Sequence, residues 1–159
     1  MGVFCSDVVM RLLIQRVTEA SVTIEGRVHS EIGKGLMVLV GIEEADTQED
    51  IDWHCGKISR LRIFDDENGV MNLDIQQAGG RAIVISQFTL FASTKKGNRP
   101  SYIRSAGEAV ARPMYEKFLA TLSEVLEAEV EHGEFGADMK VSLLNDGPFT
   151  VMLDSDEIL

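Results

Sequence analysis

The chain is poor in the residues that build cross-links and metal centres. Its 159 residues include two cysteines, Cys5 and Cys55, and three histidines, His29, His54 and His132. Two cysteines make no disulfide framework, and a reducing compartment is the simpler assumption for such a pair. No two of these five side chains show the spacing of zinc ligands. We therefore expect a cytoplasmic protein with no metal and no cofactor.

Long hydrophobic runs are also missing. No apolar stretch approaches the roughly 20 residues that span a bilayer, and the N-terminus lacks a basic region followed by an apolar core. We therefore expect no membrane partner and no secretion. Met1, Gly2 and Ser6 do match the myristoylation template, with Cys5 as a second acylation site. The simpler interpretation is a short disordered extension, residues 1–9, before a single domain at residues 10–159.

Positive charge is scarce, because 15 basic residues stand against 26 acidic ones and the net charge is −11 at pH 7. A general nucleic-acid binder needs many Lys and Arg contacts to phosphates, so we exclude broad DNA binding. Residues 81–117 nevertheless hold seven basic and two acidic residues, a local charge of +5 that leaves −16 for the remainder. This segment either contacts RNA, or its charged side chains merely keep a loop and a helix in contact with water.

Familiar catalytic motifs are absent, since the sequence contains no GxSxG, HExxH, CxxC or Walker A pattern. We interpret the three histidines, and also Asp138 and Asp146, as structural residues. Ser86 and Thr89 are candidate nucleophiles, but a hydroxyl needs an adjacent base and no histidine lies near them in sequence.

Apolar periodicity predicts a mainly antiparallel α/β domain. A helix is expected over 47–61, where Thr47 and Asp50 resemble a capping box, and a second helical region opens at Ser105 and Glu108, with Pro113 as a kink or a fresh start. The predicted strands are 12–17, 21–24, 27–32, 36–42, 70–73, 82–91, 129–132, 140–144 and 149–153. The first four form an antiparallel meander, and the last two are joined across residues 145–148.

Two segments are the most informative in the chain. Ser86 to Leu90 (SQFTL) lies on the second half of the predicted strand 82–91, where alternation places Ser86, Phe88 and Leu90 on one face. A plain strand would have the same pattern. Asn145 to Thr150 (NDGPFT) contains a Gly before a Pro, which permits a cis peptide bond and close approach of another molecule to the backbone. A tight hairpin explains the same residues.

These two segments, together with Gln15 to Val17 (QRV), Lys96 to Tyr102 (KGNRPSY) and Phe135 to Met139 (FGADM), resemble the D-aminoacyl-tRNA deacylase family, formerly D-tyrosyl-tRNA deacylases. The motifs occur in the family's order and spacing from Met10 to about Leu153. The resemblance implies a barrel-like sheet with helices outside, a homodimer, and hydrolysis of the ester between a D-amino acid and the 3′ end of tRNA.

The resemblance also implies which residues form the site. The pocket would comprise Ser86, Gln87, Phe88 and Thr89, with Gly147 and Pro148 of the partner subunit entering it through a cis peptide bond. Further site residues would be Arg16, which braces the Gly-Pro segment, Phe135 and Met139, which hold the terminal adenosine, and Asn145 and Thr150, which shape the turn. Charge alone suggests that Lys95, Lys96 and Arg99 meet tRNA phosphates.

These parts support a mechanism without a protein nucleophile, in which the 2′ hydroxyl of tRNA assists hydrolysis and backbone N–H groups stabilise the oxyanion. L-amino acids would be rejected by clash with the main chain at residues 147–148, while D-amino acids and glycine would be accepted. Two alternatives stay open: a covalent mechanism with Thr89 as the nucleophile, and a non-enzymatic, nucleic-acid-associated scaffold on the same fold.

Overall fold

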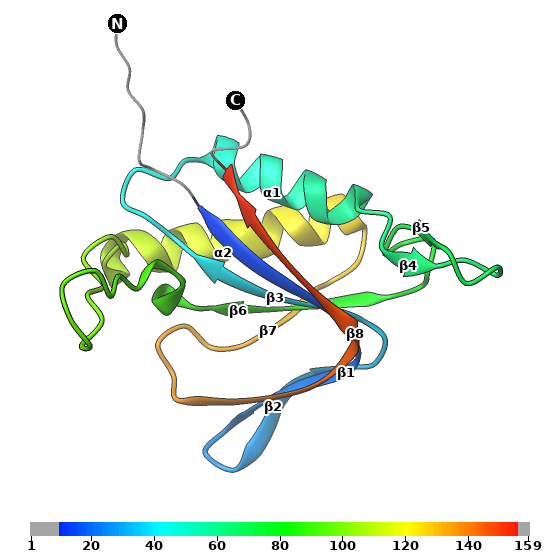
Figure 1. The fold of residues 1–159 in the computed structure, drawn as a ribbon, viewed down its shortest axis with the longest axis horizontal. Coiled ribbons are helices and arrows are strands. Elements are labelled where there is room, and N and C mark those ends of the chain that lie inside the picture. The colour runs from blue at the N-terminus through cyan, green and yellow to red at the C-terminus, as the bar shows by residue number, and fades with distance from the viewer. Residues whose placement is uncertain (1–9, 156–159) are drawn as a thin grey trace, which may run out of the picture.

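The computed structural model describes residues 10–155, so the predicted extension at residues 1–9 and its acylation pattern lie outside the described residues. A curved sheet carries two long helices on one side, as Figure 1 shows. The elements are β1 (Arg11–Ile24), β2 (Arg27–Ile32), β3 (Gly35–Gly41), α1 (Gln48–Arg60), β4 (Phe64–Asp65), β5 (Met71–Leu73), β6 (Arg81–Ser86), the 3-10 helix η1 (Phe88–Phe91), α2 (Glu108–Leu126), β7 (Glu131–His132) and β8 (Met139–Asp154).

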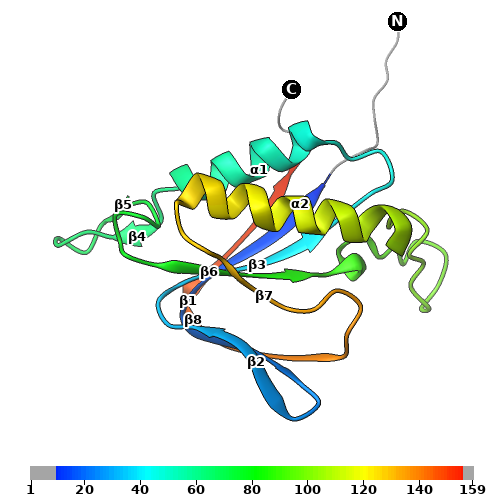
Figure 2. The same cartoon turned by 180° about the vertical axis from the view of Figure 1, so that it is seen from behind.

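Strand β1 organises the sheet. Its first half pairs antiparallel with β3, its second half pairs antiparallel with β2, and β8 runs antiparallel along its other edge. Strands β3, β6 and β7 are parallel neighbours. Ser30 Oγ on β2 donates to the His132 carbonyl on β7 at 2.8 Å, which brings the two ends of the sheet together. Figure 2 shows β7 between β6 and β2. The sheet is therefore mainly antiparallel and nearly closed, as the resemblance implies.

The predicted meander is wrong, because β3 pairs with β1 and not with β2. The predicted strands 12–17 and 21–24 are one continuous strand of 14 residues, long enough to hold both β2 and β3 along one edge. The turn at Glu25 and Gly26, both with positive φ, does form as expected. Strands 140–144 and 149–153 are likewise one strand, and both halves pair with β1 instead of forming a hairpin.

The sheet has a hydrophobic cluster on each face. On β3, Leu36 and Val38 pack toward the helices, whereas Met37 belongs to a second cluster with Val22 of β1 and Ile83 of β6. Because both faces of β3 are covered, the strand is an almost unbroken apolar run. The same burial on both faces explains the apolar run in β6.

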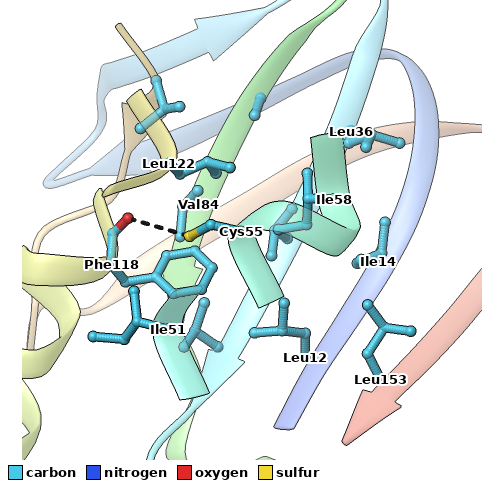
Figure 3. Packing of buried hydrophobic residues seen from close by; sticks show 14 of the residues in the cluster. Leu12, Ile14, Leu36, Ile51, Cys55, Ile58, Val84, Phe118, Leu122 and Leu153 are labelled. Carbon is cyan, nitrogen blue, oxygen red and sulfur yellow. Dashed lines mark hydrogen bonds between the residues drawn. The ribbon is translucent and has the colours of Figure 1, made fainter. Parts of the chain in front are cut away.

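The helices cover the sheet face that carries Leu36 and Val38, and their side chains pack between the side chains of the strands (Figure 3). Ile51, Cys55 and Ile58 of α1 and Phe118 and Leu122 of α2 have no exposed surface. Burying an aliphatic or aromatic side chain of this size contributes about 1.5–3 kcal/mol. No helix within residues 10–155 is long and apolar enough to span a membrane.

Helix α1 starts as predicted. Thr47 is its N-cap, and the Asp50 carboxylate accepts from the Thr47 backbone N–H at 2.8 Å. The predicted start of α2 is wrong, because Gly107 is the N-cap and Ser105 lies outside the helix. Pro113 does not restart it: α2 is continuous from Glu108 to Leu126, with one N–H donor missing at Pro113.

The predicted strand 82–91 is also wrong in its second half. Strand β6 ends at Ser86, and the chain turns into η1 after Gln87. Ser86, Phe88 and Leu90 therefore do not alternate along one strand face. The 3-10 helix packs closely on Gly41 of β3. A Cβ at Gly41 would lie only 3.0 Å from the Phe91 ring, so a larger residue would crowd this contact. Local sequence does not reveal this neighbour from another strand.

Candidate active site

The Ser86–Thr89 segment lies at the carboxyl ends of the parallel strands β3 and β6. Ser86 is paired with Val40, and the Gln87 N–H donates to the Val40 carbonyl at 2.8 Å. Open sheets with parallel strands commonly bind ligands at this end, where the chain leaves the sheet. The sheet therefore holds Ser86 and Gln87 in place, and Phe88 and Thr89 follow where the chain leaves the sheet.

A cavity of about 510 Å³ opens beside this segment. Its walls come from the ends of β3 and β6, the start of α2, and the chain from Phe135 to Val141. Of the predicted site residues, the structure brings together Ser86, Gln87, Phe88, Phe135 and Met139 around this cavity. Thr89, Arg16, Asn145, Gly147, Pro148 and Thr150 do not line it.

Two backbone N–H groups at the start of η1 are available to a ligand. The first N–H groups of a helix have no acceptor within the helix. In the described part of the chain, the N–H groups of Phe88 and Thr89 donate to no other residue. Ser105 Oγ donates to the Phe88 carbonyl at 2.8 Å and so fixes the orientation of this peptide. Paired N–H donors of this kind suit a developing oxyanion.

The hydroxyl groups of the segment have no imidazole beside them. The Thr89 hydroxyl contacts the Gln87 side-chain amide, and no histidine lines the cavity within residues 10–155. His54 is buried and donates from Nε2 to the Met10 carbonyl at 2.8 Å, while His29 and His132 contact each other near β2 and β7. No described group of three His, Cys, Asp or Glu side chains is arranged to hold a metal ion.

Phe135 is held at the cavity by residues that the sequence did not single out. The centre of its ring lies 5.9 Å from that of the Tyr115 ring, and the Arg112 guanidinium lies over the Phe135 ring, 5.0 Å from its centre. Arg112 is held in turn by Glu108, which lines the cavity. The Glu108 carboxylate accepts a hydrogen bond from Arg112 Nη2 at 2.9 Å. Glu108 and Arg112 lie four residues apart on one helix, so the sequence can predict their ion pair. No sequence pattern links that pair to Phe135.

The second predicted part of the site is a bulge in β8 opposite Arg16. Along β1, Gln15 pairs with Thr150 and Val17 pairs with Asn145, so residues 146–149 loop out of the ladder. The peptide bond between Gly147 and Pro148 in this loop is cis, as the resemblance implies. Both residues are exposed in the described chain.

Asn145 and Thr150 close the two ends of this bulge. The Asn145 amide donates to the Phe149 carbonyl at 2.8 Å and accepts from its N–H at 3.0 Å, replacing a backbone pair. Gln15 Nε2 donates to Thr150 Oγ1 at 3.1 Å on the other side. Both residues thus contribute to the shape of the turn.

Arg16 supports the bulge from beneath. Its Nε donates to the Asp146 carbonyl at 2.7 Å, its Nη1 donates to the Ile63 carbonyl at 2.6 Å, and its guanidinium lies 5.3 Å from the Phe149 ring centre. Asp65 lies 3.9 Å away as a further carboxylate partner. The contact to Ile63 was not predicted, because 47 residues separate it from Arg16.

The comparisons with known proteins agree with this geometry. The sequence model of the D-Tyr-tRNA(Tyr) deacylase family matches residues 13–154. The chain is 62% identical to D-aminoacyl-tRNA deacylase of Bacteroides thetaiotaomicron and 65% identical to that of Phocaeicola vulgatus, each over 92% of this chain and 97% of the relative.

Solved structures give the same fold. A protein named c-Myc DNA unwinding element binding protein is similar with a TM-score of 0.84 and 38% identity, covering 90% of this chain and 97% of that one. A probable eukaryotic D-amino acid tRNA deacylase has a TM-score of 0.81 at 16% identity, with 92% and 100% coverage, which bears on the fold alone. The fold and the cavity define an α/β protein of the deacylase type. The chain belongs to the D-Tyr-tRNA(Tyr) deacylase family.

Proposed function

We propose that the protein hydrolyses the ester bond of D-aminoacyl-tRNA and releases the free amino acid and tRNA. The observation that carries this proposal is the 62% identity, over 97% of its length, to a relative named D-aminoacyl-tRNA deacylase. The cavity supports it, because Ser86 and Phe88 line it together with Phe135 and Met139, the two side chains proposed to hold adenosine. Since aminoacyl-tRNA is used in the cytoplasm, we place the protein there.

The substrate brings much of the chemistry. A water molecule attacks the ester carbonyl, the 2′ hydroxyl of the ribose assists its deprotonation, and the bond to the 3′ oxygen breaks as that oxygen takes up a proton. Placing these groups together supplies several kcal/mol of the barrier. The N–H groups of Phe88 and Thr89, with the Ser86 hydroxyl, stabilise the oxyanion, and losing one such donor typically costs about 3–4 kcal/mol.

Chirality is judged by the main chain of Gly147 and Pro148, entering the cavity from a second subunit. Three observations support this arrangement. Gly147 and Pro148 are absent from the walls of their own chain's cavity. Gly147 lies six positions along β8 from the cavity residue Val141, roughly 20 Å on an extended strand. Within residues 10–155, strand β8 also pairs with no strand other than β1, and it exposes Val141, Leu144 and Met152.

A homodimer would cover this edge and complete the site. Unpaired strand edges with exposed apolar side chains readily pair with another chain. An L side chain would clash with the rigid carbonyls of residues 147–148, whereas a D side chain points away. Glycine has no side chain to reject, so we expect its ester to be cleaved as well.

The direct test is release of D-tyrosine from D-Tyr-tRNA, with L-Tyr-tRNA as the control. We expect selective release of D-tyrosine after chelator treatment. The covalent alternative is separated by Thr89→Ala, because losing a nucleophile abolishes turnover, whereas our mechanism retains substantial activity. An inactive, folded Thr89→Ala variant would overturn the backbone mechanism.

The non-enzymatic alternative is favoured by one comparison, since a solved relative of similar fold is named as a DNA-element binding protein. The charge of −11 opposes broad DNA binding by this chain. Titration with duplex DNA, run beside the deacylation assay, separates the two functions. DNA binding without any D-selective release would favour the scaffold.

A further inference from the structure

Aromatic side chains gather on the surface just outside the cavity. Phe88 is 56% exposed and Tyr102 is 39% exposed, and their rings lie 5.0 Å apart at an angle of 75°. The next residue, Ile103, is 88% exposed. Exposed apolar side chains that cluster on a surface point to a binding site, whereas ones scattered singly are ordinary. Neither ring belongs to the buried hydrophobic clusters of residues 10–155.

Three cations lie in the loop that leads to Tyr102. A pair of backbone hydrogen bonds of 2.8 Å between Ser93 and Ser101 closes this loop, which carries Lys95, Lys96 and Arg99. All three are exposed, and none forms an ion pair with a carboxylate of residues 10–155. Unpaired cations close to exposed aromatic rings are the composition of single-stranded nucleic-acid sites.

The base of this surface is fixed in place. Arg104, two residues beyond Tyr102, pairs with the buried Glu43 carboxylate at 3.1 Å. Ser105 Oγ donates to the Phe88 carbonyl and so ties the end of the loop to η1. The rings of Phe88 and Tyr102 are therefore held together before any ligand arrives, which lowers the entropy that binding costs.

The surface is continuous with the cavity, because Phe88 both lines the cavity and contacts Tyr102. A chain whose last nucleotide occupies the cavity would leave it across these two rings and then pass the basic loop. Figure 1 shows this loop at the end of the molecule where β6 and the start of α2 meet. The order from cavity to rings to cations matches a single strand entering by its 3′ end.

We propose that Phe88, Tyr102, Lys95, Lys96 and Arg99 form a platform for single-stranded RNA. On this platform the unpaired nucleotides before the terminal adenosine of tRNA stack on the rings and place their phosphates on the cations. The inference rests on the proposed function and extends it beyond the cavity. Stacking tolerates any base, so the platform binds the end common to all tRNAs and leaves selection to the cavity.

The test compares two substrates and one inert ligand. Tyr102→Ala should raise KM for D-Tyr-tRNA by roughly tenfold, the effect of losing one base stack, with kcat retained. Hydrolysis of D-tyrosyl-adenosine, which lacks the preceding nucleotides, should respond far less. A fluorescently labelled oligoribonucleotide ending in CCA should lose affinity for Tyr102→Ala to the same degree, and Tyr102→Phe should restore both values.

The cations are tested by replacing Lys95, Lys96 and Arg99 with Gln. This change should reduce the slope of log affinity against log salt by about 2 for the oligoribonucleotide. The matched control replaces Arg27, Lys57 and Arg60, which lie on β2 and α1 away from this loop and change net charge equally. The control should retain the wild-type slope.

The outcomes separate the platform from the proposed function. If D-Tyr-tRNA is hydrolysed but Tyr102→Ala changes neither its KM nor oligoribonucleotide affinity, the platform is overturned and the enzyme stands. If no tRNA ester is hydrolysed but the oligoribonucleotide binds in a Tyr102-dependent way, the platform stands and the function falls. Failure of the wild-type protein to bind the oligoribonucleotide overturns the platform directly.

Discussion

Arg16 is the residue that connects the bulge in β8 to the rest of the fold. Its guanidinium reaches the carbonyls of Asp146 and Ile63 and lies against Phe149. Arginine suits this task because its planar group presents several donors in fixed directions, which lysine does not. The side chain is 12% exposed, so water competes little for these bonds.

We predict that Arg16→Ala lowers the free energy of unfolding by about 2 kcal/mol, since hydrogen bonds from a charged donor contribute about 1.5–3 kcal/mol. Deacylation should lose at least about tenfold in kcat/KM, as a misplaced positioning loop readily costs that much. Arg16→Lys should recover part of the stability but little activity, because one ammonium cannot hold both carbonyls. Urea unfolding and the D-Tyr-tRNA assay measure the two effects, and full activity in Arg16→Ala would contradict the bracing role.

Gly147 is required by its surroundings. A Cβ at this position would overlap the backbone N of Phe149 and lie 2.7 Å from Asn145 Oδ1. We predict that Gly147→Ala displaces the bulge and lowers D-Tyr-tRNA hydrolysis by about a hundredfold, close to the effect of a 1 Å misplacement. The matched control is Gly33→Ala, where the nearest atom lies 4.0 Å away and activity should not change. Equal activities in the two variants would remove the proposed role of the loop.

Some of the residues of the candidate site could be predicted from the sequence, and others could not. The Gly-Pro pair and the SQFTL segment are recognised through the family resemblance, because a tight hairpin and a plain strand explain the same residues on pattern alone. The bulge itself cannot be predicted, since it depends on the register of β8 against Arg16 of β1 at the other end of the chain. Arg112 and Ser105 were missed for the same reason, as each acts on a residue brought near only by folding.

At the scale of elements, local signals were reliable where one element decides its own limits. Helix α1 begins after its predicted capping residue, Thr47, and the predicted strand 70–73 contains β5. Strand β6 was predicted too long, because its apolar run continues into η1, where Phe91 is buried against Gly41. Apolar periodicity indicates that side chains are buried, but it does not distinguish a buried strand from a buried 3-10 helix.

The contact between α1 and the start of β1 gives a pH-dependent stability. His54 is buried, and desolvation lowers its pKa from 6.5 to about 4. Below about pH 6.5 the unfolded chain takes up a proton that the folded protein does not, so stability falls until about pH 4. Asp46 acts with the opposite sign, because burial raises its pKa from 3.8 to about 7 and folding becomes less favourable as pH rises over that range.

We therefore predict that the two opposing slopes offset each other in part in the wild-type protein, and that His54→Gln leaves the slope from Asp46. Glutamine keeps a donor for the Met10 carbonyl but does not titrate. Relative to wild type, the variant should gain about 3 kcal/mol between pH 6.5 and 4, because its stability no longer falls with protonation. Urea unfolding of both proteins at each pH measures the difference, and a constant difference across this range would contradict the assignment to His54.

For the whole molecule, charge and assembly follow different rules. The net charge of −11 predicts that most of the surface avoids nucleic acid, and the positive segment 81–117 contributes the loop beside the cavity. The sequence alone does not show that the cavity and the Gly147–Pro148 bulge lie apart within one chain. That separation depends on where β8 crosses the sheet, which is a property of the complete fold.

This separation leads to a prediction about paired subunits. Ala137→Trp fills the cavity, and Gly147→Ala displaces the bulge, so each variant alone should be inactive. When the two are co-expressed, a mixed dimer holds one intact cavity facing one intact bulge. Random pairing makes half of the dimers mixed, each with one complete site of two, so about a quarter of wild-type activity should return. If the bulge served the cavity of its own chain, every chain would carry one defect and no activity would return. A D-Tyr-tRNA assay on the co-purified pair, with the separately purified variants mixed only in the cuvette as the control, decides between these geometries.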